Sequence, residues 1–349
     1  MHKLTVLVSL ILLGIAGFVI FNRVPQVIPP QTEDKKEVPR FEVIARNLEV
    51  PWALAFLPDG KILVTERKGI VKLVDKNGAV TEVGKINVTQ VSESGLHGIA
   101  IDPKFSENHY IYLYYTYSTN GDNTFNRVSR FNFDSSLKSE KIIIDQIPGA
   151  PNHDGGRIKF GLGNMLYITT GDAQNPSLAQ DKESFAGKIL RVTQEDKIEI
   201  FSYGHRNPQG ITWDDMGNLW ETEHGQTATD EINLIQPVRN YGWPIIRGDQ
   251  SQKDMASPYI HSGSNTWAPA GVAFFNGSLY FGGLRGQALF EYNIERKQLK
   301  EHFKGQFGRL REVVLGPDNM LYITTSNRDG RGNPQPEDDK IIRMNPEKL

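Results

Sequence analysis

The sequence predicts an all-β protein, a six-bladed β-propeller of four-stranded antiparallel blades that follows an N-terminal hydrophobic segment. Three observations favour this fold: one turn-plus-strand unit recurs six times, most copies precede a second strand with alternating apolar positions, and no long amphipathic helix pattern occurs. A single four-stranded blade cannot bury both of its faces, whereas blades stacked around an axis can. A β-sandwich or a pair of β domains is the alternative, but neither requires one unit six times.

The chain divides into three predicted parts. Residues 1–23 are a signal peptide or membrane anchor, because Lys3 precedes an apolar run over 4–21. Residues 24–40 are rich in proline and form an extended linker, and residues 41–349 form the propeller domain that carries the candidate site. No A-x-A cleavage site follows the apolar run, which slightly favours an uncleaved membrane tether. Both alternatives predict an extracytoplasmic domain, either secreted or periplasmic, or anchored to the outer face of the cytoplasmic membrane.

The six repeats share a turn with Gly, Asn or Asp that leads into a short run rich in Ile, Val, Tyr and Thr. Their first residues are Leu57, Lys104, Gly161, Asp214, Phe274 and Gly316. The strands that follow them include IVKLVD, GKILRV, EINLI, ALFEYN and KIIRMN. We expect a strand near Phe41 to complete the last blade beside residues 340–344, which would close the ring.

Composition excludes several classes of function. The formal net charge is −2, so no global positive field recruits nucleic acid or anionic lipid. The chain has no cysteine, which excludes disulfides, zinc–thiolate sites, iron–sulfur clusters and cysteine nucleophiles.

Polar segments next to the predicted strands are the candidate ligand-binding loops, because propeller loops gather at one end of the central channel. The segments are residues 92–98, 151–157, 204–244, 284–286 and 308–312. They offer a histidine, the residue most readily poised as a general base near neutral pH. They also offer several arginines, which bind carboxylates or phosphates. This combination predicts a polyanionic ligand beside a base.

The order and combination of five motifs resemble those of the soluble aldose sugar dehydrogenases and soluble glucose dehydrogenases that depend on pyrroloquinoline quinone (PQQ). The motifs are GHRNPQG, EHG followed by DEINLI, NYGWP, HDGGR and GRLREV. The resemblance covers roughly residues 41–345. It implies a quinoprotein oxidoreductase that oxidises aldose sugars at C1 to lactones. The implied cofactors are PQQ and Ca²⁺, and the implied electron acceptor is external: a quinone, a cytochrome or a dye.

The resemblance also implies a role for individual residues. His153 would be the general base that takes the proton from the C1 hydroxyl, and Arg206 would stabilise negative charge on the quinone oxygen. The residues implied around the cofactor are Glu93, which also lies near the substrate, Asn207, Arg285, Arg309 and Arg311. Backbone carbonyls would bind the calcium ion, which prefers hard oxygen ligands. The residues implied to supply them are Gly225 and Gln226.

Three positions depart from the glucose-dehydrogenase pattern. Gln226 stands where proline is expected, Asn152 stands where an aspartate precedes the base, and Glu93 stands where glutamine occurs. The partner that orients the base is therefore open. The chain also lacks long insertions at residues 249–267 and near Gly277, which favours the broad-specificity aldose branch.

Structural roles account for most of the remaining conspicuous side chains. The histidines interpreted as structural or surface residues are His97, His205, His261 and His302. Glu223 and His224 are also expected to be structural, because no second histidine lies at the spacing of an HExxH zinc site. The tryptophans expected to pack between blades are Trp52, Trp213, Trp220, Trp243 and Trp267.

Two other functions are compatible with a propeller. One is a non-catalytic extracellular propeller that binds protein or glycan, which would not need the base together with the arginines. The other is a calcium-dependent lactonase, which would need a cage of carboxylate and asparagine side chains around the metal. Fold alone does not choose among these functions.

Overall fold

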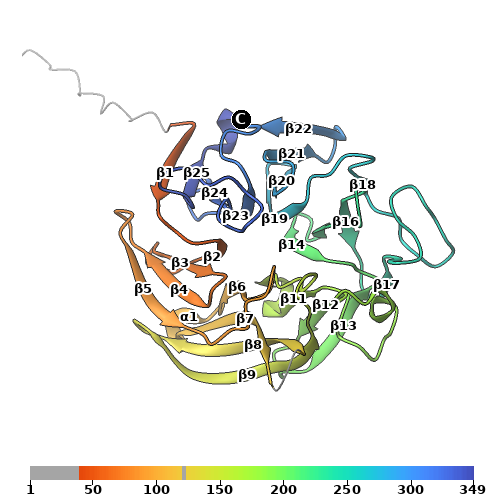
Figure 1. Ribbon diagram of the computed structural model, residues 1–349, viewed down its shortest axis with the longest axis horizontal. Coiled ribbons are helices and arrows are strands. Elements are labelled where there is room, and N and C mark those ends of the chain that lie inside the picture. The colour runs from red at the N-terminus through yellow and green to blue at the C-terminus, as the bar shows by residue number, and fades with distance from the viewer. Residues whose placement is uncertain (1–38, 120–122) are drawn as a thin grey trace, which may run out of the picture. The chain divides into compact units, whose positions relative to one another are not determined.

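The computed structural model describes residues 39–119 and 123–349, and its strands form six sheets arranged in a ring (Figure 1). The compact unit that they build spans Pro39–Leu349. The predicted signal or anchor at residues 1–23 and nearly all of the linker at 24–40 lie outside the described residues. Among the described residues, no helix has the length and apolar character needed to cross a membrane.

The first three sheets follow the chain from the inner strand of each blade outwards. The first blade contains β2 (Pro51–Phe56), β3 (Ile62–Glu66), β4 (Ile70–Val74) and β5 (Val80–Lys85). The second contains β6 (Leu96–Ile101), β7 (Tyr110–Ser118), β8 (Thr124–Phe133) and β9 (Leu137–Pro148). The third contains β10 (Ile158–Phe160), β11 (Leu166–Thr170), β12 (Lys188–Val192), β13 (Ile198–Tyr203) and β17 (Arg239–Asn240).

The last three sheets complete the ring. The fourth blade contains β14 (Pro208–Trp213), β15 (Leu219–Glu223), β16 (Glu231–Ile235) and β18 (Ile260–His261). The fifth contains β19 (Pro269–Phe275), β20 (Ser278–Gly283), β21 (Leu289–Asn293) and β22 (Gln298–His302). The sixth contains β23 (Leu310–Leu315), β24 (Leu321–Thr325), β25 (Ile341–Met344) and β1 (Phe41–Ala45). The described helices are short: α1 (Phe105–Asn108) and 3₁₀ turns at Leu162–Asn164, Pro176–Ala179 and Pro346–Lys348.

The predicted repeat corresponds to one place in every blade. Each of its six copies ends in the second strand of a sheet: β3, β7, β11, β15, β20 or β24. The segments predicted to follow the copies form third strands, namely β4, β12, β16, β21 and β25. The six-bladed architecture predicted from the sequence is therefore confirmed.

The third blade has the four expected antiparallel strands, β10 to β13, and one additional short strand. There the short strand β17 adds to the outer edge of β13 and runs parallel to it. The backbone N–H of Tyr241 then donates to the carbonyl of Tyr203 at 2.8 Å. This extra pairing holds the NYGWP segment against the third blade, so that Trp243 reaches the site described below.

The ring closes through the N-terminal strand, as the sequence predicts. Strand β1 pairs antiparallel with β25, with Phe41 opposite Met344 and Val43 opposite Ile342. Phe41 also contacts Phe303 edge-on, with ring centroids 5.6 Å apart. The sixth blade is therefore built from both ends of the propeller domain, and its strand pairing joins them.

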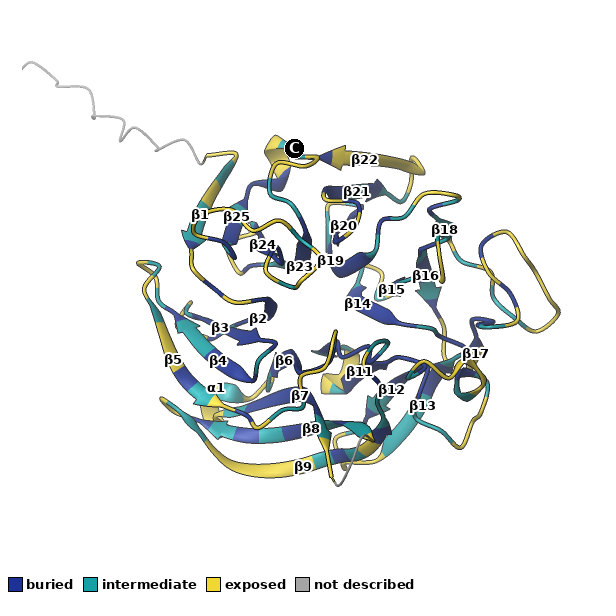
Figure 2. Cartoon of the chain, in the orientation of Figure 1, coloured by how far each residue is buried: buried dark blue, intermediate teal, exposed yellow. Residues whose placement is uncertain are grey.

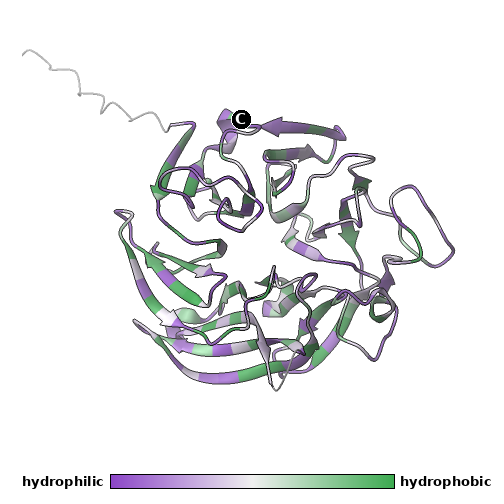
Figure 3. Cartoon of the chain, viewed as in Figure 1, coloured by the Kyte–Doolittle hydropathy of each residue, from purple (hydrophilic) through white to green (hydrophobic). Residues whose placement is uncertain are grey.

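The hydrophobic core lies between neighbouring blades. The described residues form six buried clusters, and each cluster combines side chains of two adjacent sheets. Figure 2 shows the inner strands as buried and the outer strands β5, β9 and β22 as largely exposed. In Figure 3 hydrophobic and hydrophilic residues alternate along the outer strands β8 and β9 of the second blade, as expected for strands with one partly solvated face. Stacking of blades thus supplies the burial that a single sheet lacks.

Shortening a buried side chain at the closing pair should destabilise the ring. Ile342 is fully buried and faces Val43 on one side and Ile323 on the other. Ile342→Ala should lower the free energy of unfolding by about 2–5 kcal/mol, because it removes buried methyl groups and leaves a cavity. Leu299→Ala on the exposed outer strand β22 is the control and should cost less than about 0.5 kcal/mol. Equal losses in denaturant unfolding would contradict this role of the closing pair.

Candidate functional site

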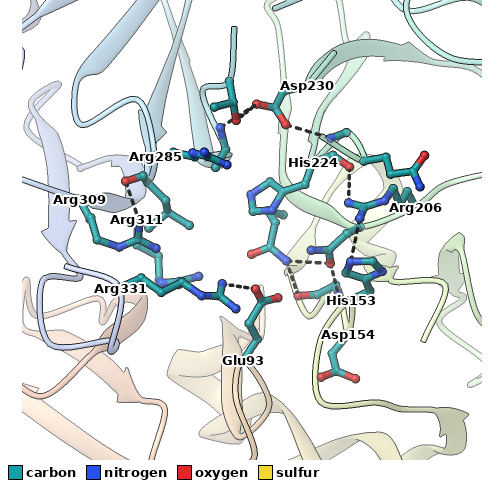
Figure 4. A pocket seen from close by; sticks show the side chains of 18 of the residues that line it. Glu93, His153, Asp154, Arg206, His224, Asp230, Arg285, Arg309, Arg311 and Arg331 are labelled. Carbon is teal, nitrogen blue, oxygen red and sulfur yellow. Dashed lines mark hydrogen bonds and ion pairs between the residues drawn. The ribbon is translucent and has the colours of Figure 1, made fainter. Parts of the chain in front are cut away.

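A pocket of about 300 Å³ is lined by residues from all five predicted polar segments (Figure 4). The predicted site residues in its wall are Glu93, His153, Arg206, Asn207, Gly225, Gln226, Arg285, Arg309 and Arg311. These are all nine residues that the sequence singled out. Their convergence follows from the ring, because loops that are far apart in the sequence lie next to one another around its centre.

His153 is held between a carboxylate and a guanidinium. Its Nδ1 lies 2.8 Å from Oδ1 of Asp172, and its Nε2 lies 2.9 Å from a terminal nitrogen of Arg206. A guanidinium can only donate, so Nε2 must accept and Nδ1 must carry the hydrogen that is donated to Asp172. The neighbours of His153 therefore select the tautomer in which Nε2 presents a lone pair to the pocket.

Asp172 is the partner of His153 that the sequence left open. It follows strand β11, its side chain is 1% exposed, and its second carboxylate oxygen accepts from the indole N–H of Trp243 at 2.8 Å. The residue before the base, Asn152, instead accepts from Ser92 at 2.8 Å. The departure at Asn152 thus leaves the base with an anionic partner. In the sequence, Asp172 could have been found as the acidic residue that ends the repeat copy GLGNMLYITTGD.

Gly171 allows the loop of the base to approach strand β11. His153 has a positive φ of 65°, and its carbonyl lies where a side chain at position 171 would begin. A Cβ built on Gly171 would be 1.8 Å from that carbonyl oxygen. Only glycine fits there, so the backbone at 171 fixes the position of the base.

Two arginines of the sixth blade share one carboxylate. Arg309 donates through Nε to Asp329 at 2.8 Å and through a terminal nitrogen to the carbonyl of Leu284 at 3.0 Å. Arg311 lies 3.8 Å from the same carboxylate. Burial lowers the pKa of Arg311 to about 10, and the nearby carboxylate of Asp329 counteracts that shift. Asp329, which sequence reasoning missed, thus orients both arginines along one wall.

A further arginine that sequence reasoning missed reaches the pocket from the loop between β24 and β25. Arg331 forms an ion pair with Glu93 and donates to Oδ1 of Asn152 at 3.2 Å. Burial of Glu93 opposes its ionisation, but the hydrogen bond from Arg331 and the charges of His224, Arg331 and Arg311 together outweigh burial and lower the pKa of Glu93 to about 2. Glu93 is therefore a carboxylate at any physiological pH.

The rings of His97 and His224 also lie in the pocket wall, although both were expected to be structural. Burial lowers the pKa of His97 to about 3 and that of His224 to about 4. His97 stacks on Trp52, and its Nε2–H donates to the carbonyl of Glu93 at 3.0 Å. His97 thus supports the wall, whereas Nε2 of His224 is buried without a protein partner in the described chain.

The loop after β15 presents backbone oxygens. The amide N–H of Gly225 donates to Asp230 at 2.9 Å, and the other carboxylate oxygen of Asp230 accepts from the amide N–H of Trp267 at 2.6 Å. The carbonyls of Gly225 and Gln226 accept no hydrogen bond from the described protein atoms. The side chain of Gln226 points to Arg247, with which it is hydrogen-bonded. The glutamine therefore leaves its own carbonyl free for a ligand.

A second cluster of possible metal ligands lies outside the pocket. Within residues 39–119 and 123–349, His205, Glu221 and Glu223 are close enough to share a metal ion, but all are buried and none lines the pocket. His205 lies 2.9 Å from Glu223, which also accepts from the backbone N–H of Arg206. The structural interpretation of His205 and Glu223 accounts for these contacts, because together they hold the backbone that carries Arg206.

The depressed pKa of His97 predicts a dependence of stability on pH. In the unfolded chain a histidine has a pKa near 6.5, so as the pH falls below about 6.5 the unfolded state takes up a proton that the folded state refuses. His97 therefore contributes stability that is lost as the pH falls towards about 3. With isotope-labelled histidine, the NMR signal of the ring should not titrate between about pH 7 and 4.5 in the folded protein. The same signal should titrate in urea, and a folded midpoint above about pH 5 would contradict this burial effect.

The family model of the glucose and sorbosone dehydrogenases matches residues 48–342. The aldose sugar dehydrogenase YliI of Escherichia coli K12 is 30% identical over 339 residues, which cover 83% of this chain and 90% of that protein. Quinoprotein glucose dehydrogenase B of Acinetobacter calcoaceticus is 29% identical over 269 residues, or 64% of this chain and 56% of that protein.

A solved structure agrees with these relatives in both fold and sequence. The PQQ-bound aldose sugar dehydrogenase of Streptomyces coelicolor is 35% identical, with a TM-score of 0.82, and the match covers 87% of this chain and 97% of that one. The six-bladed ring, the order of its motifs and these matches agree. The chain therefore belongs to the glucose/sorbosone dehydrogenase family, alongside the soluble aldose sugar dehydrogenases and quinoprotein glucose dehydrogenases.

Proposed function

We propose that this protein oxidises aldose sugars at C1 to lactones, with PQQ and Ca²⁺ as cofactors and an external electron acceptor. The observation that carries the proposal is the lone pair on Nε2 of His153, which its two neighbours direct into the pocket. Oxidation of a C1 hydroxyl to a lactone removes one proton and one hydride. A neutral imidazole in that tautomer can accept the proton.

The fit of the pocket to PQQ rests on its charges and on its unpartnered polar atoms. Three arginines that line it are candidates to bind cofactor carboxylates: Arg285, Arg309 and Arg311. Nε of Arg206 and Nε2 of His224 are buried without a protein partner in the part of the chain that is described. Such groups are costly to leave unsatisfied, so a polar ligand between them would be stabilising.

Backbone oxygens fit the calcium ion. The free carbonyls of Gly225 and Gln226 lie in the pocket wall, and Ca²⁺ prefers hard oxygen ligands of this kind. The amide of Asn207 lies in the same wall, and its Oδ1 accepts from the backbone N–H of Gly155 at 3.1 Å. When bound, PQQ would take up the hydride from C1 and calcium would polarise the quinone.

Proton transfer follows from the arrangement around His153. The sugar C1 hydroxyl would replace the guanidinium of Arg206 as the donor to Nε2 and would then transfer its proton to it. Asp172 would keep the ring in place through Nδ1 and stabilise the imidazolium that forms. Arg206, freed from Nε2 but still bound to the carbonyl of His224 at 3.0 Å, would face negative charge developing on the quinone oxygen.

The two other functions receive less support. A binding propeller has no need of a histidine whose tautomer is fixed by a buried aspartate and an arginine. A lactonase would need carboxylate and asparagine side chains that converge on a metal in the pocket. The metal-sized group of described residues, His205, Glu221 and Glu223, lies outside the pocket wall.

Reconstitution tests the proposal directly. The protein is loaded with PQQ and Ca²⁺, aldoses are added, and reduction of an artificial dye is followed together with the absorbance of the bound cofactor. We expect dye reduction and a spectral change on adding sugar. His153→Ala should abolish turnover and leave PQQ affinity within about threefold, because the base is removed while the arginines remain. A wild-type protein without either signal would overturn the proposal, and an active His153→Ala would overturn the choice of base.

Asp172→Asn tests the partner of the base. The amide can donate to Nδ1 and so favour the wrong tautomer, and it cannot stabilise an imidazolium. We expect kcat to fall by about 100-fold or more with little change in PQQ affinity. Asp249→Asn is the matched control, because Asp249 bonds His261 at 3.0 Å on the surface and should leave kcat within about twofold. Equal kcat values for the two variants would show that Asp172 does not serve the base.

A further inference from the structure

The mouth of the pocket contains a charge pair that the proposed chemistry does not use. Glu93 comes from the loop before β6, and Arg331 comes from the loop between β24 and β25, so the pair joins the second and sixth blades across the first. The side chain of Arg331 is 53% exposed and that of Glu93 is 26% exposed. Both line the pocket that holds His153, and Figure 4 shows their contact. They therefore stand where a ligand meets solvent.

The position of Arg331 is fixed by its loop. Its backbone N–H donates at 2.9 Å to Asp329, the same carboxylate that orients Arg309 and Arg311. Further along the loop, Asp339 accepts from the backbone N–H of Asn327 at 2.6 Å. These hydrogen bonds fix the backbone that carries Arg331, so its side chain is directed towards the pocket although it is exposed.

The two terminal nitrogens of the Arg331 guanidinium bind different partners, Glu93 and Asn152. Asn152 accepts from Arg331 at 3.2 Å and from the hydroxyl of Ser92 at 2.8 Å, and it directly precedes the base. The guanidinium thus lies across a corner formed by Glu93 and Asn152. At this corner the carboxylate of Glu93, which accepts hydrogen bonds, lies next to the guanidinium of Arg331, which donates them.

This chemistry suits an uncharged sugar. Each hydroxyl of a vicinal diol can donate to the carboxylate and accept from the guanidinium, so the diol can bind without separating the two charges. A hexuronate brings a carboxylate of its own, which Arg331 attracts and Glu93 repels. Because the pair is neutral as a whole, it gains nothing from an added negative charge.

We propose that Arg331 is a specificity-determining residue, which acts with Glu93 to bind vicinal hydroxyls of the substrate and to favour uncharged aldoses over hexuronates. This inference rests on the proposed oxidation of aldoses, whose substrate class it narrows. Asn152 is the positioning residue of the pair, because it holds the guanidinium beside the carboxylate.

The test measures kcat and KM of the reconstituted protein for glucose and glucuronate in variants of each partner. Arg331→Gln should raise KM for glucose by about tenfold with kcat within about twofold, because a charged donor to the hydroxyls is lost. It should also lower the ratio of kcat/KM for glucuronate to kcat/KM for glucose, because the negative charge of Glu93 then repels the carboxylate of glucuronate without a neighbouring positive charge. Glu93→Gln should raise that ratio, by about threefold or more, because the positive charge is then uncompensated. A purely structural role would not move the ratio in opposite directions.

Controls separate this inference from misfolding and from failure of the proposed function. Arg296→Gln removes an exposed arginine of a turn beyond β21 and should change neither KM nor the ratio. Thermal unfolding and PQQ affinity should match wild type in Arg331→Gln. The KM of Arg331→Lys for glucose should lie between those of wild type and Arg331→Gln, because lysine keeps the positive charge but lacks the planar set of donors. An active wild-type protein with unchanged KM and ratio in Arg331→Gln overturns the inference and leaves the proposed function standing.

A binding measurement that needs no turnover completes the test. 1,5-Anhydroglucitol keeps the vicinal hydroxyls of glucose and has no C1 hydroxyl to oxidise, so saturation-transfer NMR can follow its binding. We expect its affinity to fall by about tenfold in Arg331→Gln. If wild type reduces no dye but still binds the polyol through Arg331, only the proposed function fails. Unchanged polyol affinity in the variant overturns the role of Arg331.

Discussion

The centre of the ring depends on a buried ion pair between Arg157 and Glu312. Arg157 directly precedes β10 in the third blade and Glu312 belongs to β23 in the sixth, and both side chains are almost wholly buried. Nε of Arg157 also donates to the carbonyl of Gln209 at 3.0 Å in the fourth blade. Its guanidinium lies 4.3 Å from the ring of Trp52 in the first blade. One charge pair thus contacts four blades, and removing either partner would leave an uncompensated charge that costs about 3–5 kcal/mol.

This central contact continues into the wall of the pocket. Trp52 lies against Arg157, stacks on His97 at 4.9 Å and has the guanidinium of Arg311 at 5.8 Å from its ring. His97 in turn bonds the carbonyl of Glu93 at 3.0 Å. The packing that holds the blades together therefore also positions the polar groups of the site. A site built on packed strands rather than on free loops keeps its donors in place before a ligand arrives.

The positive charges that line the pocket favour an anionic ligand. Arginines line it from several blades, and their partners in the protein, chiefly Asp329 and Glu93, offset only part of their charge. Because buried charges are costly without partners, a ligand with carboxylates would stabilise this arrangement. The inner wall with Arg309 suits such a ligand. The mouth, where Arg331 and Glu93 neutralise each other, suits an uncharged one.

The sequence by itself determined the propeller, the closing strand at Phe41 and nine of the residues that line the pocket, because repeats and motifs are local patterns. Tertiary structure alone decided the partners. Asp172 reaches His153 because Gly171 lets two backbones meet, and Asp329 and Arg331 reach the site because the loop between β24 and β25 is folded against it. Residues far apart in the sequence become neighbours only when the ring closes. The identity of an orienting carboxylate or of a charge pair therefore depends on distances that no spacing along the chain encodes.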